Sequence, residues 1–233
     1  MTDVTAERIP LADLTQKLGV VIDPELLSLA LTHRSWAYEN GQVPHNERLE
    51  FLGDSVLGLA VTVRLFTGHP DLEEGALAKR RASVVSTVAL AEIARGIGLG
   101  EYLMLGRGEI LTGGRDKDSI LADTMEAIFG ATYLSAGADA ATGLVLRLVE
   151  PLLADPERYG AAMDPKTALQ ELAAHGGLQP PLYAVTSTGP DHDRRFTAIV
   201  TVGDVTTEGA GTSKKHAEMA AALTAWRELS GRA

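Results

Sequence analysis

The sequence predicts an N-terminal all-α domain over residues 9–153 and a C-terminal α+β domain, of order α-β-β-β-α, over residues 164–232. Through the first two thirds of the chain, apolar residues recur at intervals of three and four, which is the period of a helix. The last third instead contains alternating β-branched runs, which are typical of strands. Residues 154–163 lie between these parts, carry proline and glycine without an apolar period, and are the expected linker.

The first domain is predicted to be a succession of helices. Pro24 suits the first turn of one helix, and Glu74 lies in the first turn of another, where a carboxylate suits the helix dipole. In chain order, helices are expected over residues 9–20, 24–38, 46–66, 72–97, 119–134 and 138–153. The glycine-rich residues 106–115 lack the Gly-Lys-Ser/Thr ending and the preceding strand of a phosphate loop, so a plain connection is expected there.

The second domain is predicted to contain a helix, three strands and a final helix. Glycine and proline pairs separate its first helix from its first strand. The expected ranges are 165–175 for the first helix, 183–188, 196–202 and 205–209 for the strands, and 213–229 for the last helix. About 70 residues in this order are enough for a small independent domain.

Composition restricts the chemistry that the chain can perform. There is no cysteine, so disulfides and thiolate zinc sites are excluded, and the six histidines lack metal-ligand spacing. Any metal should therefore be bound by oxygen. No leader segment and no apolar run of about 20 residues is present, so a cytoplasmic protein is expected. The formal charge of −10 would by itself argue against a nucleic-acid partner.

Three acids interrupt the otherwise apolar helix expected over residues 46–66. Glu47, Glu50 and Asp54 are spaced i, i+3 and i+7, so they lie within about 60° of one another on one helix face. Most of the remaining surface of this helix is apolar, and buried carboxylates without partners are costly. A cation is therefore expected at this face, either a divalent ion with oxygen ligands or arginine side chains.

A second pair of acids lies on the helix expected over residues 119–134. Asp123 and Glu126 are spaced i, i+3 and also share a face. If this face meets the first one, the carboxylates converge, and one or two Mg²⁺ ions suited to phosphoryl chemistry would offset their repulsion. Structural salt bridges are the alternative, and their candidate partners are Arg48, Arg80, Arg81 and Arg107.

Lys214 and Lys215 occupy the first turn of the last helix, where cations are unfavourable for the helix dipole. Phosphates bound against that helix N-terminus would explain their position, and a solvated lysine pair is the alternative. Gln170 on the first helix and the loop at residues 189–195 add two further polar zones. Three such zones match the way small domains span successive grooves of double-stranded RNA.

These segments together closely resemble bacterial ribonuclease III. The resemblance is carried by residues 46–57, by residues 119–126, and by the Lys-Lys-x-Ala-Glu run at residues 214–218, and it covers roughly residues 10–230. It implies a helical endonuclease domain followed by a double-stranded-RNA-binding domain. It also favours metal ions over salt bridges at the acids.

The resemblance implies a role for each acid by its position. Glu50, Asp123 and Glu126 match Mg²⁺ ligands, and Asp54 and Glu126 match the residues designated catalytic. Acids close to the substrate or to the metal ligands are matched by Glu47 and Glu74.

The resemblance also implies contacts with partners. Phe51 matches an aromatic residue that packs into the second subunit of a homodimer. Gln170 and His192 match minor-groove contacts, and Lys214 and Lys215 match phosphate contacts. No departure from the family pattern occurs at the metal-binding positions.

The implied function is an endoribonuclease that cuts double-stranded RNA by two-metal (Mg²⁺) hydrolysis. It would leave 5′-phosphate and 3′-hydroxyl staggered ends, and would act in ribosomal RNA maturation and in messenger and transfer RNA processing. A non-catalytic double-stranded-RNA binder or assembly factor is the main alternative. A metal phosphohydrolase acting on small phosphorylated molecules is a third interpretation, which the separate RNA-binding domain disfavours.

Overall fold

The computed structural model describes residues 10–153, 161, 164–190 and 194–231. By their internal contacts these form two compact units, divided between Pro156 and Glu157. The expected linker lies outside the described residues except for Ala161, so the domain boundaries expected from the sequence stay predictions. No helix in the described ranges combines the length and the apolar character needed to cross a membrane.

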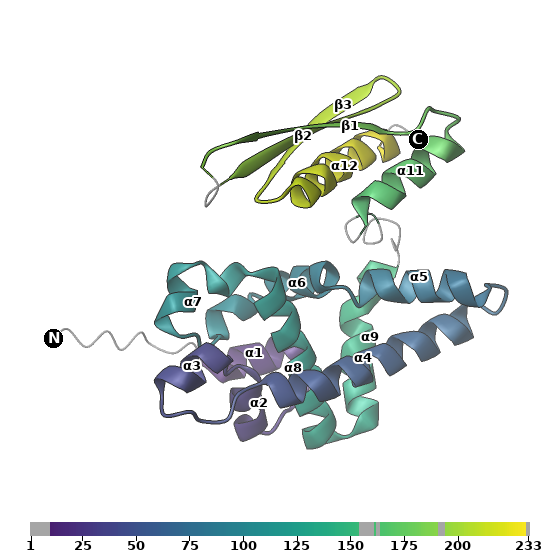
Figure 1. The fold of residues 1–233 in the computed structure, drawn as a ribbon. Helices are drawn as coiled ribbons and strands as arrows, with labels where there is room; N and C mark the ends of the chain where they lie inside the picture. Colours follow the sequence, from purple (N-terminus) through teal and green to yellow (C-terminus); the bar gives the residue numbers. More distant parts are fainter. Residues whose placement is uncertain (1–9, 154–160, 162–163, 191–193, 232–233) are drawn as a thin grey trace. The chain divides into compact units, whose positions relative to one another are not determined.

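The first unit is helical in all its described regular elements apart from one isolated bridge (Figure 1). Its elements are α1 (Leu11–Leu18), α2 (Pro24–Ala30), α3 (Arg34–Glu39), α4 (Glu47–Gly68), α5 (Glu74–Val84), α6 (Thr87–Gly96), the 3₁₀ turn η1 (Leu99–Tyr102), α7 (Arg107–Leu111), the 3₁₀ turn η2 (Gly114–Asp116), α8 (Asp118–Ala136) and α9 (Ala138–Leu153). This confirms the expected all-α architecture.

Three expectations about individual elements were wrong. The helix expected over residues 72–97 is two helices, because Ser86 caps α6 by accepting a hydrogen bond from the backbone N–H of Ala89. The segment 24–38 is also divided, because the backbone beside Thr32 pairs with Met104. The expected plain connection at residues 106–115 contains α7 and part of η2.

The centre of the first unit is the crossing of α4 and α8, where two glycines bring the helix backbones into direct contact. A Cβ atom added to Gly53 would lie 1.7 Å from the carbonyl oxygen of Glu126. One added to Gly130 would lie 2.3 Å from the carbonyl oxygen of Leu49. Any larger residue would push the helices apart. The crossing therefore places the acid-bearing turns of the two helices against each other.

The second unit has the expected order of a helix, three antiparallel strands and a helix. Its elements are α11 (Pro165–His175), β1 (Leu182–Thr188), β2 (Arg195–Val202), β3 (Val205–Gly211) and α12 (Lys214–Ser230). The sheet order is β1-β2-β3, and both helices lie on one face of the sheet (Figure 1). The core is made by Leu169 and Ala173 of α11, Ala198, Val200 and Val202 of β2, Val205 of β3, and Ala217, Ala221, Ala222 and Ala225 of α12.

Small residues let α12 approach this sheet closely. A Cβ atom added to Gly209 of β3 would lie 2.2 Å from the backbone nitrogen of Ala221. The face of α12 toward the sheet is accordingly built from alanines. Because the helix is held at backbone distance, its N-terminal turn is placed by packing and not by a flexible connection.

Candidate metal centre and nucleic-acid interface

Three carboxylates from the crossing of α4 and α8 form the candidate metal centre. Glu50 of α4 and Asp123 and Glu126 of α8 each offer an oxygen, and these oxygens all lie within 4.8 Å of one another. All three side chains are half-buried. The backbone contact at Gly53 produces this convergence, because it brings the Glu126 turn to within one helical turn of Glu50. The three carboxylates could hold a metal ion.

The electrostatics of the cluster favour proton or cation binding. Burial is the largest cause that raises the pKa of Glu126 to about 7, and the charges of Asp54, Asp123 and Glu50 raise it further. Burial is also the first cause of the raised pKa of Glu50 and Asp123, and nearby carboxylates add to it. The ionised cluster is thus unfavourable without a compensating cation.

The arginines considered as structural partners do not compensate these acids. Arg80 contacts His69, and Arg81 donates a hydrogen bond to Thr62. Among the described residues, no ion pair joins Arg48, Arg80, Arg81 or Arg107 to the cluster. A cluster whose donors are all oxygens, and whose three acids have raised pKa values, fits a hard divalent ion.

Glu47 and Asp54 flank the cluster on α4. The Glu47 carboxylate lies 3.4 Å from the guanidinium of Arg34 and 3.8 Å from Nδ1 of His45, and its charge raises the pKa of Asp123 and Glu50. Asp54 is exposed. Arg34 was not predicted from the sequence, although its charge lowers the pKa of both Glu50 and Asp123, because no local pattern indicates that it lies near these acids.

Glu74 is not brought to the cluster within one chain. It begins α5, which follows the C-terminal end of α4, and α4 rises by about 27 Å between Glu50 and Gly68. A substrate-side role for Glu74 needs either a long substrate or a second chain.

Phe51 begins a row of exposed apolar side chains along α4. The exposed fraction of Phe51 is 80%, and Leu59, Val63 and Phe66 on the same helix are 67%, 52% and 70% exposed. Their spacing of eight, four and three residues keeps them near one face. Large apolar side chains that gather on one exposed face are typical of a surface that binds a partner.

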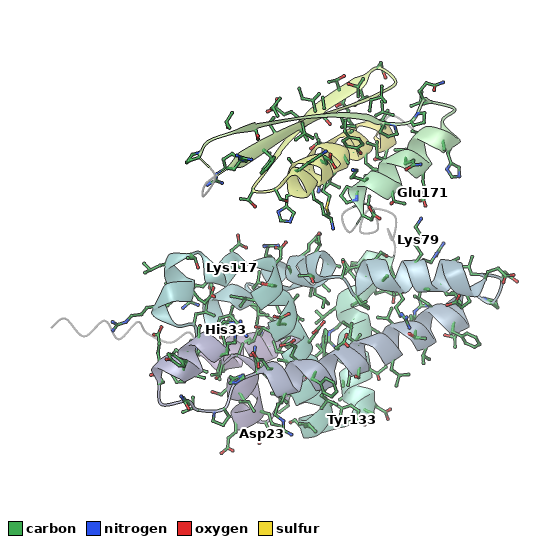
Figure 2. The ribbon with its side chains drawn as sticks, viewed as in Figure 1. Asp23, His33, Lys79, Lys117, Tyr133 and Glu171 are labelled. Carbon is green, nitrogen blue, oxygen red and sulfur yellow. The ribbon has the colours of Figure 1, made fainter. Side chains whose placement is uncertain are left out.

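A cavity of about 650 Å³ lies between α3, the loop before α4, and α7. Its polar lining includes His33, Arg34, His45 and Glu109. Figure 2 labels His33, at the start of α3, and Lys117, which binds the Glu109 carboxylate at 2.6 Å. Burial lowers the pKa of His33, so its imidazole favours the neutral form. No local sequence pattern indicates this cavity, because its lining comes from segments more than 60 residues apart in the chain.

The second unit exposes the predicted RNA-binding side chains that the structure describes. Lys214 and Lys215 lie in the first turn of α12, whose N-cap Ser213 accepts a hydrogen bond from the backbone N–H of His216. Gln170 is exposed on α11, next to Glu171, which Figure 2 labels. His192 lies outside the described residues.

Comparisons with known proteins assign both units. A profile described as ribonuclease-III-like matches residues 23–152, and a double-stranded RNA binding motif matches residues 165–229. Ribonuclease 3 of Leifsonia xyli subsp. xyli is 71% identical over 217 residues, which are 93% of this chain and 92% of that protein. Ribonuclease 3 of Mycobacterium tuberculosis is 58% identical over 226 residues, which are 95% and 93% of the two chains.

A solved structure agrees with the helical unit. The nuclease domain of ribonuclease III from Campylobacter jejuni, described as flexible in a region involved in dimer formation, matches with 40% identity and a TM-score of 0.58. The match covers 61% of this chain and 97% of that domain. Fold and site together define a nuclease domain joined to a double-stranded-RNA-binding domain. The chain belongs to the ribonuclease III family.

Proposed function

We propose that this protein uses Mg²⁺ to cut both strands of double-stranded RNA as a homodimer. As a ribonuclease III it is an endoribonuclease for double-stranded RNA, so the proposal concerns how its own residues perform that reaction. The observation that carries the proposal is the cluster of Glu50, Asp123 and Glu126, in which three carboxylate oxygens lie within 4.8 Å of one another. A polyanionic substrate would be repelled by such a cluster unless cations were bound there.

Magnesium fits the donor set of this cluster, because every ligand atom is a carboxylate oxygen and the pKa of each acid is raised. In this proposal Glu50, Asp123 and Glu126 hold the metal. Bound Mg²⁺ would supply an activated water and neutralise the charge that develops on the phosphodiester.

The remaining roles belong to the protein side chains. Asp54 is proposed as a catalytic residue beside Glu126, and this role is supported by its exposure and by its charge, which raises the pKa of Glu126. Hydrolysis that breaks the bond between phosphorus and O3′ leaves a 5′-phosphate and a protonated 3′-hydroxyl. The pKa of Glu126 is raised to about 7 in the metal-free chain, so Glu126 gives up a proton when it binds the metal and then serves as an ionised ligand. Glu47 and Glu74 are proposed to lie near the substrate.

A second copy of the chain is the proposed partner of the exposed row on α4. Phe51, Leu59, Val63 and Phe66 would be buried in an isologous interface, in which the same face of both subunits meets. Two active sites related by twofold symmetry would cut opposite strands at an offset, which gives staggered ends. Dimer formation by the Campylobacter jejuni domain supports this arrangement.

The proposed substrates are ribosomal RNA precursors and structured messenger and transfer RNA precursors. Recognition would depend on the shape of the A-form helix and on 2′-hydroxyl groups, with contacts from Gln170, His192, Lys214 and Lys215. Because such transcripts are made in the cytoplasm of bacteria, we place the protein there. The proposed domain boundaries are 9–153 for the catalytic domain and 164–232 for the RNA-binding domain.

A gel assay with a long RNA duplex and a single-stranded control tests the proposal. We expect shortening of the duplex in Mg²⁺, and binding without cleavage in Ca²⁺. E126Q should abolish cleavage and leave duplex binding within about twofold, because it removes one charge from the cluster and no contact from the second unit. E101Q, at an exposed acid outside the cluster, is the matched control and should cleave normally. Binding without cleavage by the wild type in every metal tried would support a non-catalytic binder instead.

A further inference from the structure

The carboxylate of Glu218 in the second unit is buried and contacts two lysines, and the stability of its own helix does not explain this position. Glu218 on α12 is buried, with 12% of its side chain exposed, although acids seldom occupy such sites. Each of its two oxygens meets a different lysine. Oε2 lies 2.7 Å from Nζ of Lys166 on α11, and Oε1 lies 3.8 Å from Nζ of Lys214 one turn earlier on α12.

Helix stability gives no reason for this arrangement. A lysine that precedes a glutamate by four residues is the weaker orientation of an i, i+4 pair. Lys214 also stands at the helix N-terminus, where a cation opposes the dipole. The Lys214 side chain is 68% exposed, so its pair with Glu218 adds little to the stability of the helix, but it draws the ammonium toward a carboxylate that Lys166 holds in place.

Lys166 is held from two sides. Its ammonium forms the short ion pair with Glu218 and also lies 4.6 Å from the centroid of the Tyr183 ring on β1. It joins the N-terminal turn of α11, the helix that carries Gln170, to α12, the helix that carries Lys214. The Glu218 carboxylate therefore links α11 and α12, the two helices that are proposed to contact RNA.

We propose that Glu218 is a positioning residue for RNA binding: its carboxylate fixes Lys214 and the N-terminal turn of α11 in the arrangement that meets the RNA backbone. The inference rests on the proposed binding of double-stranded RNA by the second unit. It makes a prediction of unusual sign. An acid that has no role in binding only repels the RNA phosphates, so neutralising it should strengthen binding. Neutralising Glu218 should instead weaken binding.

The test compares E218Q with E208Q in the full chain. Glu208 is exposed on β3 in the same unit and has no ion pair among the described residues, so the two variants remove the same charge. Affinity for a short RNA duplex is measured in Ca²⁺ by fluorescence anisotropy, at about 0.1 M and 0.3 M salt. E208Q should bind as tightly as wild type or slightly more tightly. E218Q should bind about fivefold more weakly, which is the effect expected from loosening a pre-positioned side chain.

Salt and kinetics separate positioning from other effects. Removing a negative charge that only repels RNA can strengthen binding but cannot weaken it, so weaker binding by E218Q at either salt concentration reports the lost placement of Lys214 and α11. In Mg²⁺, cleavage of a long duplex by E218Q should show a raised KM and an unchanged kcat, because the acidic cluster lies in the other unit. A thermal melt establishes that the variant is folded at the assay temperature.

K166M replaces the ammonium that lies over the Tyr183 ring and pairs with Glu218 by an uncharged side chain of similar length, so it tests the link between α11 and α12 if E218Q does not fold. It should also weaken binding, and the double variant should bind no more weakly than either single variant. If wild type binds RNA and E218Q binds as tightly as E208Q, the inference is overturned. If wild type binds no RNA duplex, the proposed function fails first.

Discussion

The close contact between α4 and α8 predicts how much stability the substitution Gly53→Ala should cost. In Gly53→Ala the new Cβ atom would lie 1.7 Å from the carbonyl oxygen of Glu126, and real Cβ atoms do not approach closer than 3.0 Å. The two helix backbones must therefore separate by about 1.3 Å, because the obstacle is backbone and not a movable side chain. Overpacking of this kind costs about 3 kcal/mol, which in a unit of this size lowers Tm by roughly 6–12 °C.

The same displacement acts on catalysis, because Glu126 moves away from Glu50. A shift of about 1 Å in a reacting group reduces rate roughly 100-fold, so G53A should lose at least that much cleavage in Mg²⁺. It should also lose the rise in Tm that Mg²⁺ gives the wild type by binding the folded state. Thermal melts with and without Mg²⁺, together with single-turnover cleavage, measure both effects.

Gly143→Ala is the matched control for this experiment. Gly143 is exposed in α9, and a Cβ atom there would meet nothing within 4 Å. Replacing an unstrained helical glycine by alanine stabilises by about 0.5–1 kcal/mol, so G143A should melt slightly higher and cleave normally. Normal melting and cleavage by G53A would refute the view that backbone contact at the crossing assembles the acidic cluster.

Three further predictions concern charge and hydrogen bonding. The folded-state pKa of Glu126, about 7, lies above the ordinary glutamate value of 4.5, so the native metal-free chain binds more protons than the unfolded chain between these values. Its free energy of unfolding should fall as pH rises from 4.5 to 7, and E126Q or added Mg²⁺ should reduce this slope in denaturant titrations. Replacing Lys214 and Lys215 by alanine should weaken duplex binding and lower the slope of log K against log salt by about one unit for each phosphate that is no longer neutralised; an unchanged slope would place both lysines in solvent. The buried hydroxyl of Tyr183 has no hydrogen-bond partner among the described residues, so Y183F should leave Tm and RNA affinity unchanged or raise Tm, and a destabilisation above about 1 kcal/mol would mean that the hydroxyl is satisfied.

The sequence was informative wherever a local pattern determines the structure. The spacing of acids on residues 46–66 and 119–134 was enough to predict two faces with carboxylates, because helical geometry depends only on residue number. The order of elements in the second unit followed from the change of apolar period and was confirmed. Both results rest on neighbours within a few residues in the chain.

Tertiary contacts explain what the sequence analysis missed. The break between α2 and α3 depends on backbone pairing with Met104, about 70 residues further along the chain, which no local pattern reveals. Gly53 and Gly130 looked like ordinary helical glycines until their positions opposite a backbone were known. Arg34 gains its influence on Glu50 only because the loop before α4 brings it near the cluster.

The net charge of −10 is a poor guide to the partner, and the positions of individual acids show why. Glu50, Asp123 and Glu126 are negative where the reaction needs cations, so the charge that they add to the free chain is offset when metal binds. Glu218 is negative where two lysines need a fixed direction, so its effect on RNA is set by geometry and not by Coulomb repulsion at a distance. An acid can therefore favour the binding of a polyanion in two physically different ways. The two can be separated experimentally, because removing metal abolishes the first and leaves the second unchanged.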